Sequence, residues 1–186
     1  MAVKKEEKDN IMRKIKLEKV TLNCGTGADQ AKLEKAKKLL QVLSEKKPVN
    51  TKSKQRIPGF GIRVGLPIGC KVTIRGEKAP GLLKRLLETG GNKLKIKQFN
   101  PGSFAFGIKE YIEIPGIVFQ RDVGIMGLDV CVTLTRPGYR IEEKKRKSGK
   151  VPESHRITKE ETIQFVKDNF NTEMLEKHSG GKYDRK

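Results

Sequence analysis

Residues 70–76 read CKVTIRG, and their strict alternation of apolar and polar side chains predicts a half-buried β-strand. The three apolar side chains share one face, which other elements of the fold must cover. The opposite face carries two cations and a hydroxyl, from Lys71, Thr73 and Arg75. The stretch therefore predicts a sheet with one packed face and one open, cationic face.

Two other segments alternate in the same way. Residues 15–24 predict a strand whose alternation slips once, as at a β-bulge, and residues 128–135 (LDVCVTLT) predict another. Between them, residues 94–119 contain the runs IKQF, SFAFGI and EYIEIPGI, which predict short strands and loops.

Three helices are predicted from the spacing of apolar residues. The first covers residues 33–43 and ends before Pro48, and the second follows Pro80 and stops at the glycine pair 90–91. The third spans residues 158–170 and begins with a Thr-x-x-Glu capping box. The sequence thus predicts an α+β fold: a mainly antiparallel sheet with helices packed on one face, the other face and loops being left open to a partner.

The two ends of the chain are polar. Residues 1–12 predict a flexible N-terminal arm and residues 171–186 a polar C-terminal tail. Residues 13–170 are left as a single domain.

The charge is strongly one-sided. The 186 residues include 41 Lys or Arg against 22 Asp or Glu, a net charge of +19, and the cations are spread along the chain. Such an excess points to an anionic partner. No apolar run approaches the ~20 residues of a membrane span, and no signal-peptide pattern follows the charged N-terminus. Nucleic acid is therefore the favoured partner, with no membrane and a cytoplasmic location.

The segment 46–76 concentrates this charge. It holds eight Lys or Arg and five Gly, with no acidic residue. The run 144–150, KKRKSGK, is a second basic segment, and phosphate contact is the expected role of its cations.

Catalysis and cofactor binding have little support. Cys24, Cys70 and Cys131 are widely spaced in apolar alternating runs, which predicts buried, reduced thiols and neither disulfides nor a zinc site. The turn at residues 25–27 lacks the third glycine of a dinucleotide loop. We expect no catalytic residue, no metal and no cofactor.

The scarcity of aromatic residues narrows the type of RNA. Only ten are present, with no Trp, and the alternating Phe104 and Phe106 are expected to lie in the core. Base stacking of single strands is therefore disfavoured, and structured RNA is expected to be read through phosphates, 2′-hydroxyls and shape.

Six blocks of sequence are then informative together: IKLEKVTLNCGTG, VLSEKKPVNTKSK, GFGIRVGLPIGCKVTIRGEKA, SFAFGI, GIMGLDVCVTLTRPGYR and HRITKEE. In this order, over roughly residues 10–170, they resemble the universal large-subunit ribosomal protein that binds 5S rRNA, numbered five in bacteria and archaea and eleven in eukaryotes. The C-terminal blocks resemble the archaeal and eukaryotic branch. The short chain length and the sequence GIMGLDVCVTL are typical of the archaeal type.

The resemblance implies an α+β fold, no enzymatic activity, and a role in holding 5S rRNA in the central protuberance of the large ribosomal subunit. It also implies that a protruding loop at residues 53–66 reaches the P-site tRNA and a small-subunit head protein, forming an intersubunit bridge. Large-subunit rRNA and neighbouring ribosomal proteins are the remaining implied partners.

The family reads 5S rRNA with an Asn, a Gln and a Thr, which fall here on Asn23, Lys46 and Thr73. Lys46 departs from the pattern, and so do Ser103, where Asn is usual, and Arg56, where a small residue is usual. The full expected set for 5S rRNA is Asn23, Lys46, Thr73, Lys71 and Arg75. The loop set is Lys52, Lys54, Arg56, Gly59, Gly61 and Arg63, and the set for other rRNA is Arg136, Arg140, Lys144, Lys145, Arg146, Lys147, His155 and Arg156.

Two other interpretations stay open at this point. One is a generic RNA-binding or RNA-chaperone protein without 5S specificity, which the charge alone would explain. The other is an enzyme that uses a nucleotide or modifies RNA, which would bind a nucleotide at residues 25–27.

Overall fold

The computed structural model describes residues 10–175. Its main element is a six-stranded sheet in the order β2-β3-β1-β7-β6-β5, in which every neighbouring pair is antiparallel. The strands are β1 (Lys16–Gly25), β2 (Val49–Lys52), β3 (Pro67–Ile74), β5 (Phe99–Asn100), β6 (Ser103–Ile108) and β7 (Leu128–Thr135). With the helices below, this confirms the α+β prediction.

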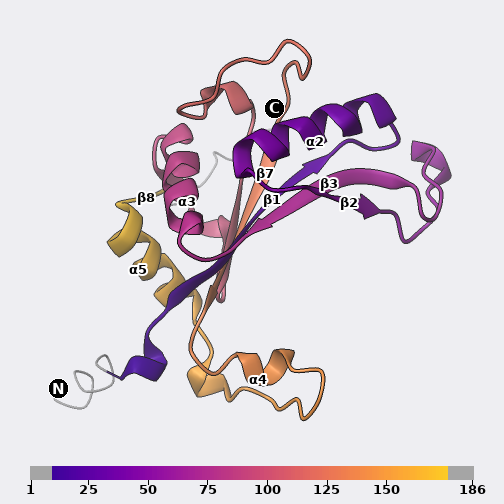
Figure 1. The fold of residues 1–186 in the computed structure, drawn as a ribbon. Helices are drawn as coiled ribbons and strands as arrows, with labels where there is room; N and C mark the ends of the chain where they lie inside the picture. The colour runs from indigo at the N-terminus through magenta and orange to yellow at the C-terminus, as the bar shows by residue number, and fades with distance from the viewer. Residues whose placement is uncertain (1–9, 176–186) are drawn as a thin grey trace, which may run out of the picture.

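The helices are α2 (Gln30–Ser44), α3 (Lys78–Thr89), α4 (Arg140–Glu143) and α5 (Lys159–Phe170). Short 3-10 turns occur at η1 (Ile11–Arg13), η2 (Pro58–Phe60), η3 (Ile96–Gln98), η4 (Tyr111–Glu113) and η5 (Glu153–His155). Figure 1 shows α2 lying along β1 and β3, with the β2–β3 hairpin projecting beyond it and α4 at the opposite end of the molecule.

One continuous core joins the sheet to these helices. In the central strands, alternate side chains such as Val20 and Leu22 of β1 and Val130 and Val132 of β7 are fully buried. The apolar stripes predicted for α2 and α3 are buried against them. Phe104 and Phe106 also lie in this core, stacked in series with Phe99, as expected.

The predicted slip of β1 is present. The register between β1 and β7 shifts between Leu17 and Lys19, which is the signature of a β-bulge. The capping box of α5 is also confirmed, because Thr158 Oγ1 accepts from the Glu161 amide and the Glu161 carboxylate accepts from the Thr158 amide.

Two segments differ from the sequence prediction. Of residues 94–119, only Ser103–Ile108 forms a strand longer than two or three residues, while EYIEIPGI forms the turn η4 and a loop. Tyr111 explains this, because its ring is fully buried and its hydroxyl accepts from the Gln120 amide at 3.2 Å. Within the expected tail, Glu173–Leu175 forms β8, which pairs in parallel with β4 (Lys93–Lys95). The rest of that tail and residues 1–9 of the expected arm lie outside the described residues.

A buried arginine anchors α5 to the sheet. The Arg136 side chain is only 5% exposed, and its Nη1 donates to the carbonyl of His155 at 3.1 Å. Its Nη2 donates to Glu161 Oε1 at 2.6 Å. Burial raises the pKa of the Glu161 carboxyl, but the Thr158 backbone amide and the Arg136 guanidinium outweigh this effect and hold the pKa below its usual value.

Gly69 of β3 has no room for a side chain beside β1. A Cβ at Gly69 would lie 2.6 Å from the carbonyl oxygen of Cys24, whereas a Cβ at its partner Gly25 would meet nothing within 4 Å. We expect Gly69→Ala to lower the free energy of unfolding by about 1–3 kcal/mol, and Gly25→Ala to change it by less than about 0.5 kcal/mol. Urea titration of both variants measures this. Equal effects at the two positions would show that the contact of a Gly69 Cβ with the Cys24 carbonyl is not what limits this site.

The Arg136–Glu161 pair makes a pH-dependent contribution to stability. Because the folded-state pKa of Glu161 is lowered, the contribution is complete above the ordinary carboxyl pKa and is lost as the pH falls through the folded value. Glu161→Gln should therefore cost about 1 kcal/mol at neutral pH and nothing near pH 2. Glu160→Gln serves as the control, because Glu160 is exposed. The measurement is thermal unfolding of each variant between pH 2 and 7. A wild-type to Glu161→Gln difference that stays constant with pH would contradict this account.

Candidate nucleic-acid interface

The face of the sheet opposite the core, called here the open face, displays polar side chains from four strands. Because successive residues of a strand point to opposite sides, the residues between the buried ones all reach this face. In β3 these are Lys71, which is exposed, and Thr73, which is half-buried. They alternate with Cys70, Val72 and Ile74 of the core.

Three rows of residues cross the open face; the first two take one residue from each of β3, β1, β7 and β6, and the third takes one from each of β1, β7 and β6. The first row runs through Lys71, Asn23, Asp129 and Gly107; the second through Thr73, Thr21, Cys131 and Ala105; and the third through Lys19, Thr133 and Ser103. Neighbouring strands lie about 4.8 Å apart, so the face is a shallow grid of amide, hydroxyl and charged groups.

The structure brings three of the five residues expected to contact 5S rRNA together on this grid. Asn23 of β1 lies opposite Lys71 of β3 in the strand register, and Thr73 lies one row further along β3, opposite Thr21. Asn23 and Thr73 are thus diagonal neighbours, about 7–8 Å apart between their Cα atoms. Residues from two distant segments, 23 and 71–73, form one polar patch because β1 and β3 are antiparallel neighbours.

The other two lie at the border of the grid. Arg75 is exposed and directly follows the last residue of β3. Lys46 is exposed at the end of α2, where its amide donates to Ser44 Oγ at 3.3 Å. Since β2 starts at Val49 opposite Lys71 and runs antiparallel to β3, the chain just before Val49 lies beside the Thr73 end of β3.

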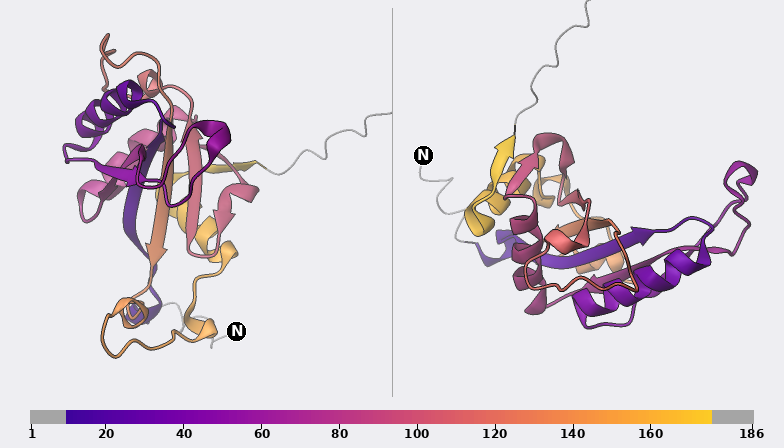
Figure 2. Two further views of the ribbon diagram at one scale, coloured as in Figure 1. Left: turned by 90° about the vertical axis from the view of Figure 1, so that its right-hand side faces the viewer. Right: turned by 90° about the horizontal axis from the view of Figure 1, so that it is seen from above.

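The loop of residues 53–66 forms a hydrogen-bonded hairpin. The Ser53 amide donates to Leu66 O at 2.9 Å, and Ile57 and Ile62 exchange two backbone hydrogen bonds. The tip is the 3-10 turn η2, closed by Gly61 in the left-handed region at φ 65°. The cations of this loop and of the preceding strand, Lys52, Lys54, Arg56 and Arg63, are all exposed, as is Gly59. Phe60 at the tip is 75% exposed, and the hairpin stands clear of the sheet in Figure 1 and in the right-hand view of Figure 2.

The basic run 144–150 lies at the other end of the sheet, after α4 (Figure 1). It returns to α4 through a hydrogen bond from the Gly149 amide to Ile141 O at 3.2 Å. Arg140 of α4 is exposed, and so are four cations of the run, Lys144, Lys145, Arg146 and Lys147. The hairpin and this run are therefore two separate cationic projections from one sheet.

Three residues expected to contact other rRNA are engaged within the fold. Arg136 is buried in its contacts with α5, so its guanidinium does not reach the surface. His155 is half-buried, with Nε2 2.9 Å from Pro137 O and its ring edge against Tyr139. Arg156 is exposed but pairs with Glu142 at 3.1 Å. We therefore leave Arg136 and His155 out of the candidate interface.

The expectation of three buried cysteines is wrong for Cys131. Burial raises the pKa of the Cys24 thiol to about 11 and also raises that of Cys70. Cys131 is exposed in the second row of the open face. The alternation of residues 128–135 contained this signal, since Cys131 falls between the positions of Val130 and Val132. Asp129 and Thr133 reach the open face for the same reason and were not singled out from the sequence.

The glycine turn at residues 25–27 is occupied by the fold itself. The amides of Thr26 and Gly27 both donate to the carbonyl of Ile68, at 3.0 and 3.1 Å. Asp29 then caps α2 by accepting from the amides of Ala31 and Lys32. These amides are not available to a phosphate, which removes the support for a nucleotide site there.

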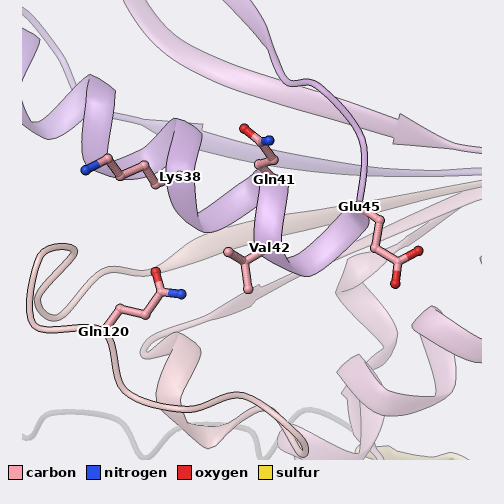
Figure 3. Close-up of a pocket in the computed structure, with 5 residues that line it drawn as sticks. All are labelled: Lys38, Gln41, Val42, Glu45 and Gln120. Carbon is pink, nitrogen blue, oxygen red and sulfur yellow. The ribbon is translucent and has the colours of Figure 1, made fainter.

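A surface pocket lies between α2 and the loop that contains Gln120. Figure 3 shows Val42 and Gln120 pointing toward each other across it, while Gln41 turns away. Lys38 and Glu45 complete its lining, and this set combines no nucleophile with a base. Within residues 10–175, no group of three His, Cys, Asp or Glu side chains is placed to hold a metal ion. No helix in the same range is long and apolar enough to cross a membrane.

Comparison with known proteins covers nearly the whole described fold. Residues 10–63 match the family described as Ribosomal protein L5, and residues 67–165 match the model of the C-terminus of the same ribosomal family. Large ribosomal subunit protein uL5 of Sulfolobus acidocaldarius is 45% identical over 177 residues, covering 95% of this chain and 99% of that protein. The uL5 proteins of Nanoarchaeum equitans and Archaeoglobus fulgidus are each 48% identical, covering 88% of this chain and 98% and 92% of those proteins.

Proposed function

The chain belongs to the ribosomal protein L5 family of the large ribosomal subunit, and from this premise we propose that its open face binds 5S rRNA. A member of this family is a structural part of the cytoplasmic ribosome and not an enzyme. The similarity to archaeal relatives agrees with the archaeal type expected from the sequence. Ribosomal RNA follows as a partner from membership itself, and the choice of 5S rRNA is the proposed step.

The observation that carries the proposal is the shared patch of Asn23, Lys71 and Thr73 on the one sheet face that α2 and α3 leave uncovered. An amide, a hydroxyl and an ammonium group within two rows can engage base edges, 2′-hydroxyls and phosphates together. The wide, shallow minor groove of helical RNA presents these groups to a surface without deep pockets. Lys46 and Arg75 add charge at the border of the patch, where phosphates are the natural partners.

The two projections have different proposed partners. The hairpin of residues 53–66 extends away from the patch, and we assign it to the P-site tRNA and to a protein of the small-subunit head, in an intersubunit bridge. Its glycine-closed tip and one-signed charge suit sequence-independent contact with RNA that must later be released. We assign the exposed cations of 140–147 to neighbouring rRNA in the central protuberance.

A generic RNA-binding protein remains the second candidate, because the net charge of +19 would attract any structured RNA. The two candidates differ in selectivity. Charge alone predicts equal binding to 5S rRNA and to a tRNA of similar size, with both lost together as salt rises.

Replacing Thr73 tests the patch. We expect wild type to prefer 5S rRNA over tRNA by ~100-fold at high salt, and Thr73→Ala to lose about 1–3 kcal/mol of this preference because a hydroxyl contact is removed. Thr73→Ser is the matched control, since it keeps the hydroxyl and should keep most of the preference. Competition binding at two salt concentrations is the measurement. Equal binding of both RNAs by wild type would favour the generic candidate.

The different partners proposed for the two projections give a separate prediction. Replacing Lys54, Arg56 and Arg63 together by Ser should leave 5S rRNA binding by the free protein nearly unchanged and weaken P-site tRNA binding in reconstituted ribosomes. Replacing Lys144, Lys145 and Lys147 by Ser removes the same charge and should instead lower the salt slope of rRNA binding by about 2–3. Identical effects of the two triple variants on both assays would contradict the assignment.

A further inference from the structure

Asp129 places a carboxylate in the middle of the row that crosses the open face at Asn23. The row runs from Lys71 through Asn23 to Asp129, with Gly107 beyond it on β6. The amide of Asn23 is therefore flanked by a cation on one side and an anion on the other, each about one strand spacing away. An anion at this position is unexpected on the nucleic-acid face of a protein with a net charge of +19.

No protein cation neutralises this carboxylate within the part of the chain that the structure describes. The ion pairs found among residues 10–175 all use other acidic side chains. The side chain is exposed, so its oxygens are available to a bound partner.

The surface beside Asp129 is low and accessible. A Cβ built on Gly107 would lie 3.6 Å from Asp129 Oδ1, so the carboxylate stands next to bare backbone of β6. The other β6 residues on this face, Ala105 and Ser103, are also small. A base edge can approach the carboxylate over this floor without meeting a long side chain.

The chemistry of a carboxylate restricts what it can meet in RNA. It only accepts hydrogen bonds, so it pairs with exocyclic amino groups of bases, as Asp and Glu do with cytosine N4. A phosphate is anionic and only accepts, and is repelled. Lys71, two strand spacings away, has the opposite preference and attracts phosphate.

We propose that Asp129 is a specificity-determining residue of the open face, accepting a hydrogen bond from the exocyclic amino group of an RNA base. Its charge also keeps the phosphate backbone on the Lys71 side of Asn23, which fixes the orientation of the bound RNA. The inference rests on the proposed function of this face as the site for 5S rRNA.

The test removes the charge and, separately, the whole carboxylate. Asp129→Asn and Asp129→Ala are compared with wild type in binding to 5S rRNA and to a tRNA of similar size, at low and high salt. Glu34→Gln is the matched control, since Glu34 is an exposed acid on α2, which packs on the other side of the sheet. Thermal unfolding confirms that each variant is folded.

The two RNAs should respond in opposite directions. Asp129→Ala should weaken 5S rRNA binding about tenfold, and both Asp129 variants should bind tRNA about two- to fivefold more tightly at low salt, because phosphates are no longer repelled. Glu34→Gln should shift both RNAs equally and leave their ratio unchanged.

Failure of this inference can be told apart from failure of the proposed function. A wild type that prefers 5S rRNA, with Asp129 variants that keep the same ratio as Glu34→Gln, overturns the role of Asp129 alone. A wild type without preference for 5S rRNA overturns the proposed function and this inference together.

Discussion

Strand β1 hydrogen-bonds to β3 on one side and to β7 on the other, and this double pairing decides which side chains meet on the open face. Val20 and Leu22 of β1 are completely buried, so the pairing is held by the core on one face. The residues between and beyond them, including Asn23, must then face the other way. A shift of one residue in either register would move the polar patch into the core and the core residues into solvent.

The placement of the two basic projections follows from the same sheet. The hairpin continues β2 and β3 beyond the packed region, and the run 144–150 follows the far end of β7. Folding the core therefore sets the distance between a flat binding surface and two cationic projections. Under the proposed function, contacts with several RNAs would be separated along this one rigid sheet.

Patterns that depend on neighbouring residues could be predicted from the sequence. Alternation predicted β3 and the open position of Thr73, apolar spacing predicted α2 and α3, and the capping box predicted the start of α5. Distant contacts could not be predicted. Arg136 looked like a surface cation, and its burial depends on Glu161, 25 residues away. Tyr111 converts an apparent strand into a turn through a contact with a loop that shows no pattern of its own.

The polar patch combines features that the sequence predicts with features that depend on the fold. The family resemblance supplied Asn23 and Thr73 as single positions, whereas their proximity and the row with Asp129 depend on the strand register. Alternation in residues 128–135 placed Asp129 on a polar face, but nothing local indicated that this face adjoins Asn23.

Chemical modification of lysines with and without 5S rRNA tests the central claim most directly, because exposed lysines lie on both sides of the sheet. The account predicts that bound 5S rRNA protects Lys71 on the open face and leaves Lys35 on α2 as reactive as in the free protein. Protection of Lys35 with continued reactivity of Lys71 would contradict it, since the RNA would then lie on the helical side.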